Sequence, residues 1–132
     1  TGDVWCWGRN DLGQVGDVDT SDHLTPTGVV GLAEASAICA GYGHSCALTT
    51  AGGVACWGSN TSGQLGNGTF EDSYQPVEVT SITTATGLWC GQHHSCATLE
   101  DGTVLCWGLN DEGQLGNPET GYRSSEPVQV AF

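Results

Sequence analysis

The sequence predicts an all-β protein built from β-propeller blades, each with four antiparallel strands. The phrase CWGRNDLGQVGD, which starts at Cys6, recurs as CWGSNTSGQLGN at Cys56 and as CWGLNDEGQLGN at Cys106, a period of 50 residues. Each period contains short apolar runs separated by turns that contain glycine, and no run has helical periodicity. A repeat of this length is one supersecondary unit that buries its apolar face against its neighbours, and four short strands per unit are typical of a propeller blade.

The 132 residues hold about 2.6 repeats of 50 residues. We expect a partial first repeat over residues 1–30, which is the second half of a blade, a second repeat over 31–80, and a third over 81–132 that includes the start of the next strand. A partial array leaves blade edges open. The chain is therefore expected to be part of a larger propeller or assembly, with its open edges covered by other protein chains or by self-association.

The third repeat shows the expected strands most completely. SITTATGLWC (81–90) and HHSCATL (93–99) are runs suited to the first two strands, and TVLCWG (103–108) is the third. Glu100, Asp101 and Gly102 form the turn between the second and third strands, where glycine tolerates the positive φ of a hairpin. After a loop, PVQV (127–130) is a short fourth strand, matched by the segments that follow Pro26 and Pro76.

The repeated phrase predicts packing between blades. A tryptophan is large enough to fill the space between stacked sheets, and glycine allows positive φ or close backbone approach. The glutamine amide would satisfy loop carbonyl and N–H groups. Because every copy carries these residues, we assign them structural rather than catalytic roles: Trp7, Trp57, Trp107, Gly63, Gln64, Gly66, Gly113, Gln114 and Gly116.

The net charge of −13, from 15 acidic residues and two Arg, excludes nucleic acid as a partner, because phosphate contacts require a basic face. No segment is long and apolar enough for a membrane span. Acidic side chains in the predicted loops indicate a solvated surface. Cation binding and attraction of a basic partner are the alternatives.

Cysteines recur at the same positions of successive repeats, and this recurrence predicts disulfide bonds and an oxidising compartment. The hairpin turn places Cys96 opposite Cys106, and the same count places Cys46 opposite Cys56. Opposed Cβ atoms in an antiparallel pair lie ~4.5–5.5 Å apart, which is close to disulfide geometry. Cys6 has no such partner, because the other half of its blade is missing.

Two alternatives for the cysteines stay open. Cys39 and Cys90 are a candidate further disulfide that would join adjacent blades. Zinc could instead be held by sets such as His44, Cys46 and Cys56, although the spacing is not that of a zinc knuckle. We expect no metal, and we expect His44 and the equivalent His94 to be buried with their ring nitrogens bonded to loop carbonyls.

Asn60 and Asn67 begin N-x-Ser/Thr sequons and are candidate glycosylation sites. Asn60 is also the turn asparagine of its repeat, and Asn67-Gly68 is a common turn dipeptide. Asp17-x-Asp19 has a weak likeness to a calcium loop, without its glycine and terminal glutamate. No motif nominates a reaction, so we predict no catalytic residue, no cofactor and no enzyme activity.

The segments HSCAL, GVACWGSN and GQLGNG, followed by a Pro-Val strand, resemble the regulator-of-chromosome-condensation repeat family over nearly the whole chain. The resemblance implies a propeller of seven blades, which 2.6 repeats cannot close. The family includes exchange factors for small GTPases, ubiquitin-ligase modules and secreted bacterial propellers, one of which inhibits β-lactamases. The paired cysteines are similar to the secreted branch. We therefore expect an extracellular or cell-surface module for protein interaction or structural assembly, with guanine-nucleotide exchange on a small GTPase as the alternative.

Overall fold

The computed structural model describes residues 1–132, with ten β-strands and no helix. The strands are β1 (Trp5–Gly8), β2 (His23–Gly28), β3 (Ala35–Ala40), β4 (His44–Thr49), β5 (Val54–Gly58), β6 (Ser73–Glu78), β7 (Ala85–Cys90), β8 (His94–Leu99), β9 (Val104–Leu109) and β10 (Arg123–Gln129). The protein has no helix that could cross a lipid bilayer.

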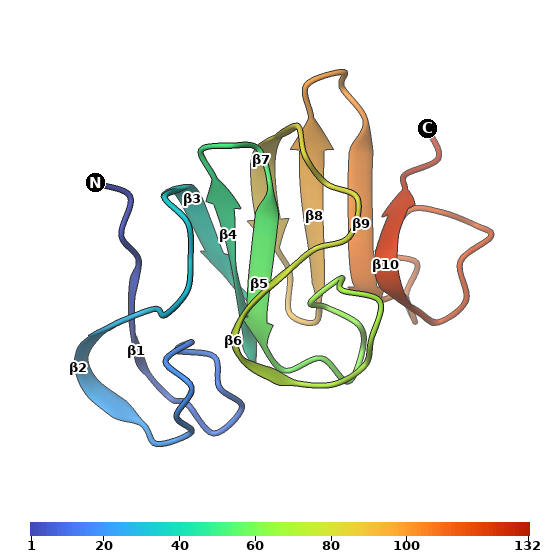
Figure 1. The fold of residues 1–132 in the computed structure, drawn as a ribbon. Helices are drawn as coiled ribbons and strands as arrows, with labels where there is room; N and C mark the ends of the chain where they lie inside the picture. Colours follow the sequence, from blue (N-terminus) through green and yellow to red (C-terminus); the bar gives the residue numbers. More distant parts are fainter.

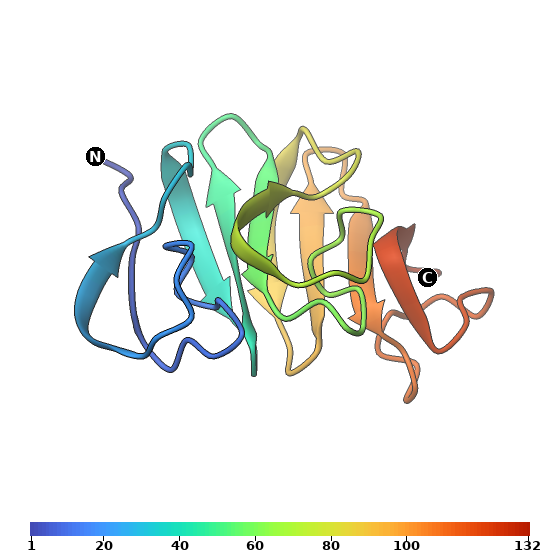
Figure 2. The same ribbon diagram turned by 60° about the horizontal axis from the view of Figure 1, so that its bottom comes forward.

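The strands form three antiparallel sheets that stand in a row (Figure 1). One sheet has the order β3-β4-β5-β6, the next has the order β7-β8-β9-β10, and a smaller sheet contains β1 and β2 alone. Each sheet lies within one of the three expected repeats. The two chain termini lie at opposite ends of the row, and a second view shows the same arrangement (Figure 2). The fold is that of successive propeller blades, the first of them half a blade.

Hairpin turns connect the second and third strands of each complete blade. At the turn between β8 and β9, the Leu99 N–H donates to the Thr103 carbonyl at 2.9 Å, and Gly102 has a φ of +87°. The strand register then places Cys96 opposite Cys106. Because an L-residue rarely adopts this φ, glycine sets both the turn and the register of the strands.

The pairing between the third and fourth strands of each blade is interrupted at the tryptophan. The register between β5 and β6 shifts between Cys56 and Gly58, and Gly58 has a φ of +105°. A Cβ atom at Gly58 would overlap the Gly43 carbonyl oxygen. Glycine is therefore required here both for its backbone conformation and for the close approach of two strands.

The hydrophobic core lies between the two complete sheets. It contains 11 buried residues from both blades, among them Trp107 from β9, Leu48 from β4 and Leu65 from the loop after β5. A sheet buries an apolar face only when another layer covers it, so the core forms where two complete blades stack. This seam is the reference for the less complete seam between the first and second blades.

Candidate functional site: blade seams and acidic loops

The tryptophans of the second and third blades bind the preceding blade through one repeated hydrogen bond. Trp57 Nε1 donates to the Gln14 carbonyl at 2.9 Å, and Trp107 Nε1 donates to the Gln64 carbonyl at the same distance. Gly66 lies against the Trp107 ring, where a Cβ atom would come within 2.7 Å of the indole. The two rings are 1% and 0% exposed, so each tryptophan is a buried link between blades.

Trp7 differs from its two equivalents, and its packing between blades stays a prediction. Its side chain is 62% exposed. The loop that would accept its indole N–H would belong to a preceding blade, and no such loop is among residues 1–132. The repeat position is the same, but the burial depends on a neighbour.

The glutamine side chains support their own loops. Gln64 Oε1 accepts the Ser62 N–H at 2.9 Å, and Gln114 Oε1 accepts the Glu112 N–H at 2.9 Å. Their Nε2 atoms donate to side-chain oxygens rather than to the loop carbonyls that we predicted. The four glycines that we predicted to pack between blades all have positive φ: Gly63, Gly66, Gly113 and Gly116.

An asparagine secures each long loop, fully buried at positions 10 and 60 and partly exposed at 110, a role that the sequence analysis missed. Asn60 Nδ2 donates to the carbonyls of Thr69 and Glu71 at 2.8 and 2.9 Å, and its Oδ1 accepts the Leu65 N–H at 2.9 Å. The recurrence of asparagine at positions 10, 60 and 110 was the available signal.

The burial of Asn60 also corrects its assignment as a glycosylation candidate. Nδ2 is the atom that would carry the glycan, and here it is fully buried and already donates hydrogen bonds. A glycan cannot be attached without opening the loop. Asn67 is partly exposed and stays a prediction.

Three disulfides join six of the seven cysteines. Cys46 is bonded to Cys56 and Cys96 to Cys106, each within one hairpin. The third bond, between Cys39 and Cys90, connects β3 to β7 and so joins two blades across their seam. The predicted zinc sites would need thiolates, and four sulfurs are bonded to one another instead: those of Cys46, Cys56, Cys96 and Cys106.

Cys6 is the one free cysteine, and it is partly buried in β1. Burial raises the pKa of the Cys6 thiol above its ordinary value, because a thiolate is poorly solvated there. The thiol form therefore dominates at neutral pH, and Cys6 is a weak nucleophile in this chain.

His44 is buried at the seam between the two complete blades, with 1% of its surface exposed. Its Nε2 lies 2.9 Å from Ser95 Oγ, and that hydroxyl donates its hydrogen to the Gln64 carbonyl at 3.1 Å. Nε2 must therefore donate to Ser95, which leaves Nδ1 unprotonated, and Nδ1 has no partner. The expected bond to a loop carbonyl is replaced by a bond to a serine, which itself bonds the carbonyl.

We expect the stability of the protein to fall between pH 6.5 and pH 4 because of His44. Burial, and secondarily the charges of His93 and His94, lower the pKa of His44 to about 4. Between this value and the ordinary value of 6.5, the unfolded state binds a proton that the folded state does not, so folding is favoured above pH 6.5 and loses up to about 3 kcal/mol by pH 4. Urea unfolding at several pH values measures the loss. The variant His44→Gln should have a flatter profile, and identical profiles would contradict the assignment.

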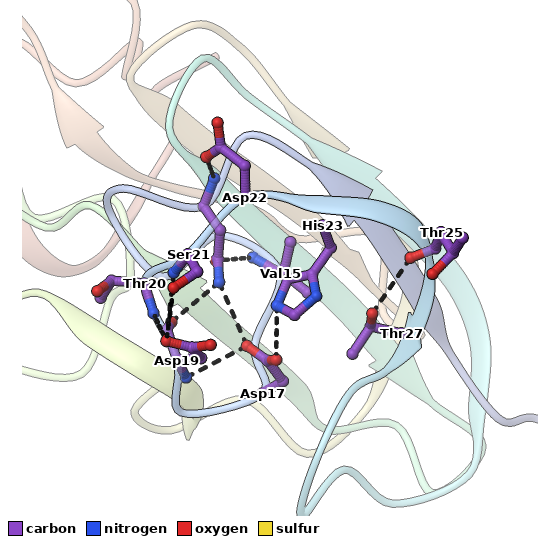
Figure 3. A network of polar contacts seen from close by, with 10 residues as sticks. Val15, Asp17, Asp19, Thr20, Ser21, Asp22, His23, Thr25 and Thr27 are labelled. Carbon is purple, nitrogen blue, oxygen red and sulfur yellow. Dashed lines mark hydrogen bonds and ion pairs between the residues drawn. The ribbon is translucent and has the colours of Figure 1, made fainter.

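The first long loop is closed by carboxylates and a histidine (Figure 3). His23 Nε2 lies 2.8 Å from Asp17 Oδ2, and Asp22 accepts the Asn10 N–H at 2.9 Å. Asp19 accepts the N–H groups of the next two residues, which lower the pKa of its carboxyl group. The weak likeness to a calcium loop is thus a set of carboxylates that bond donors of their own loop.

The two arginines are engaged within the chain. Arg9 forms two hydrogen bonds with the Asp11 carboxylate, at 2.6 and 2.7 Å. The Arg123 guanidinium lies 3.7 Å from the centre of the Phe70 ring and donates to the Thr61 carbonyl. With no lysine in the chain, most carboxylates face solvent without a nearby cation.

The chain matches two family models, both described as regulator of chromosome condensation (RCC1) repeat. One covers residues 1–48 and 51–98, and the other covers 35–64 and 90–114. No significant match exists among curated protein sequences.

Several solved structures share the fold. Human WBSCR16 has a TM-score of 0.87 at 21% identity, over 98% of this chain and 33% of its own. Prp20p from Saccharomyces cerevisiae, described with its binding to Gsp1p and histones, has a TM-score of 0.85 at 21% identity, over 98% of this chain and 34% of its own. Yeast RCC1 (Prp20) bound to Kap60 gives 0.82 at 24% identity, over 99% and 32%. The chain spans about a third of the length of these proteins. Its motifs, blades and family matches together show that the chain belongs to the regulator of chromosome condensation (RCC1) repeat family.

Proposed function

We propose that the chain is a non-catalytic protein-interaction module of an RCC1-type propeller, and that it works outside the reducing cytosol. The observation that carries this proposal is the set of three disulfides, one of which joins neighbouring blades. Such bonds form and persist mainly in oxidising compartments such as the extracellular space. The proposal therefore includes an extracellular or cell-surface location.

The structural roles of the repeated residues support a function of the protein that does not involve catalysis. The buried tryptophans join blades, the glutamines and asparagines close loops, and His44 is enclosed with a lowered pKa. A protein needs its catalytic site only once, whereas these contacts recur in successive repeats. Residues that recur in this way are therefore explained by structural roles. The long loops lie at the end of the sheets opposite the hairpin turns (Figure 1). We propose that a partner protein binds to these loops.

The charge of that surface indicates a basic partner. Both arginines are held by groups of this chain, and the net charge is −13. Unopposed carboxylates attract a basic protein and accelerate its association. Among proteins with this fold, Prp20p is described with its binding to histones, which are basic. We therefore assign this chain a partner with a basic binding surface.

Surface plasmon resonance with immobilised oxidised chain tests the proposal, with histones as the basic probe and an acidic protein of similar size as the control. We expect histone binding that weakens as salt rises from 50 to 300 mM, since exposed charges are then screened. The variant Glu71→Gln with Glu112→Gln, in the long loops, should lower the association rate about threefold or more.

The matched variant Glu78→Gln with Glu100→Gln removes the same charge outside the long loops. Equal effects of the two variants would show binding by net charge alone and would contradict a loop site. Blocking of free thiols in intact cells, before lysis, tests the compartment. We expect Cys6 alone to be labelled, and labelling of all seven cysteines would contradict an extracellular location.

Nucleotide exchange on a small GTPase is the second candidate, favoured by the likeness in fold to Prp20p, which is described with its binding to Gsp1p. Release of a fluorescent guanine nucleotide from Gsp1p, measured with reduced and with oxidised chain, separates the two functions. Accelerated release by the reduced chain would favour exchange over the extracellular module.

A further inference from the structure

The first long loop brings three side chains that can bind a metal ion to one place (Figure 3). Asp17 and Asp19 lie in the loop, and His23 is the first residue of β2. One carboxylate oxygen from each aspartate and one ring nitrogen of the histidine lie within 4.8 Å of one another. Oxygen and imidazole donors together are a ligand set for a divalent transition metal such as zinc.

Each aspartate uses one oxygen to close the loop. Asp17 Oδ1 accepts Asn10 Nδ2 at 3.3 Å and the Asp19 N–H at 3.2 Å. Asp19 Oδ1 accepts the N–H groups of Thr20 and Ser21 at 2.7 and 3.2 Å. The second oxygen of each carboxylate accepts no hydrogen bond. Donors behind a ligand orient it at metal sites in this way, so both carboxylates are held in place with an oxygen available.

The His23 ring nitrogen is the third donor, and it is not satisfied by the protein. Nε2 lies 2.8 Å from Asp17 Oδ2, but this contact lacks the geometry of a hydrogen bond, and Nε2 is buried without another partner. A buried polar atom without a hydrogen bond costs free energy. An ion that accepted lone pairs from both atoms would remove this cost.

The other two long loops close without this set of residues. Asn67 Oδ1 accepts the Thr69 N–H at 3.2 Å, and Asn117 Oδ1 accepts the Glu119 N–H at 2.9 Å, as Asp17 does with Asp19. Closure of the loop therefore needs only an acceptor at the first position. The residues at the position of His23 are serine and arginine: Ser73 and Arg123. The repeat does not explain why the first loop has a second carboxylate and an imidazole, whereas a site that is needed once does.

Charge and donor type select the ion. The chain has a net charge of −13 and no lysine, and Arg9 is bonded to Asp11 instead of to these aspartates. A divalent cation therefore meets a negative field at the loop. Calcium takes six to eight oxygen ligands, whereas zinc is bound by three protein ligands and one water in open sites. Ligands about 2.0–2.2 Å from zinc lie roughly 3.3–3.6 Å apart, which small side-chain shifts reach from the observed positions.

We propose that Asp17, Asp19 and His23 bind one zinc ion, with each residue supplying one ligand atom and a water completing the coordination. This inference goes beyond the proposed function, because the three ligands all belong to this chain and need no partner protein. The ion would connect the start of β2 to the loop and would neutralise two carboxylate charges on it. The first long loop would then be more rigid and less acidic with zinc than without it.

Isothermal titration of the oxidised, chelator-treated chain with zinc chloride tests the proposal. The titration uses the Cys6→Ser chain, so that the one free thiol cannot bind the ion. We expect one zinc ion per chain, a melting temperature that rises with zinc concentration, and slower amide hydrogen exchange over residues 17–23. Calcium and magnesium chloride at the same concentrations should give no such change.

Two ligand variants use residues that the second loop already contains, so each should fold. Asp17→Asn copies Asn67, and His23→Ser copies Ser73. Each should weaken zinc binding at least about tenfold, as changes even behind the ligands of metal sites do. The matched control is Asp22→Asn, which removes the same charge from the same loop and keeps an oxygen for the Asn10 N–H. This control should leave the zinc affinity unchanged.

Four outcomes would overturn the proposal. Absence of zinc binding by the folded chain would exclude the site. Unchanged affinity in His23→Ser would exclude the imidazole as a ligand and place any bound zinc elsewhere. Equal losses in Asp17→Asn and Asp22→Asn would show attraction by charge alone. Tighter binding of calcium than of zinc would contradict a site with a nitrogen ligand. None of these outcomes bears on histone binding, which is measured without zinc.

Discussion

Replacing Trp107 by alanine is expected to lower the free energy of unfolding by about 3–5 kcal/mol, the range for large aromatic residues in protein cores. The Trp107 ring is fully buried in the core between the two complete blades. The substitution removes its contacts, leaves a cavity against Gly66 and deletes the hydrogen bond to the Gln64 carbonyl. Urea unfolding followed by circular dichroism measures the loss.

Trp7→Ala is the matched control, because it makes the same change at the same repeat position. Its side chain is mostly exposed, so the expected change is within about 0.5 kcal/mol. Trp107→Phe keeps most of the apolar contact but loses the N–H donor, and should cost about 1–2 kcal/mol. Trp107→Phe takes the place of Trp107→Ala in this comparison if Trp107→Ala does not fold. Equal losses for Trp7→Ala and Trp107→Ala would contradict the assignment of Trp107 as the link between blades.

Removal of the Cys39–Cys90 disulfide is the second change that we expect to lower the free energy of unfolding strongly. The two residues are 51 positions apart, and the chain-entropy model gives about 4 kcal/mol for a loop of that length. Because the bond crosses a seam, its loss also frees β3 to move away from β7. Urea unfolding of the double variant Cys39→Ala, Cys90→Ala and of the parent protein measures this loss of stability.

The hairpin disulfide Cys46–Cys56 is the control for this experiment. Its cysteines are 10 positions apart, so the same model gives about 3 kcal/mol. Hydrogen exchange adds a readout of location: loss of Cys39–Cys90 should speed exchange in β3 and β7, and loss of Cys46–Cys56 should act within β4 and β5. A smaller effect for the bond between blades than for the bond within the hairpin would contradict the entropic account.

The hairpin cysteines and Cys39 show how far sequence reasoning reached. The turn at Gly102 fixes the register by counting residues, so the opposition of Cys96 and Cys106 could be predicted from local sequence alone. The pair Cys39 and Cys90 could only be a candidate, because it joins strands of different blades whose relative position no local pattern encodes.

Exposure was the property that local sequence predicted least well. Trp7 and Trp107 stand in the same phrase, yet one is mostly exposed and the other is fully buried. Asn60 reads as an acceptor for a glycan, whereas in the folded loop its amide is enclosed by backbone carbonyls. Burial depends on neighbours that are distant along the chain.

By itself, the sequence determined the repeat, the strands and turns of each blade, the hairpin disulfides and the acidic character of the surface, because periodicity, glycine positions and charge act over short separations. The tertiary structure alone decided how the blades bond to one another and that His44 is enclosed with an unpartnered nitrogen. These features arise where two units stack, and a unit's own sequence does not state which neighbour stands against it.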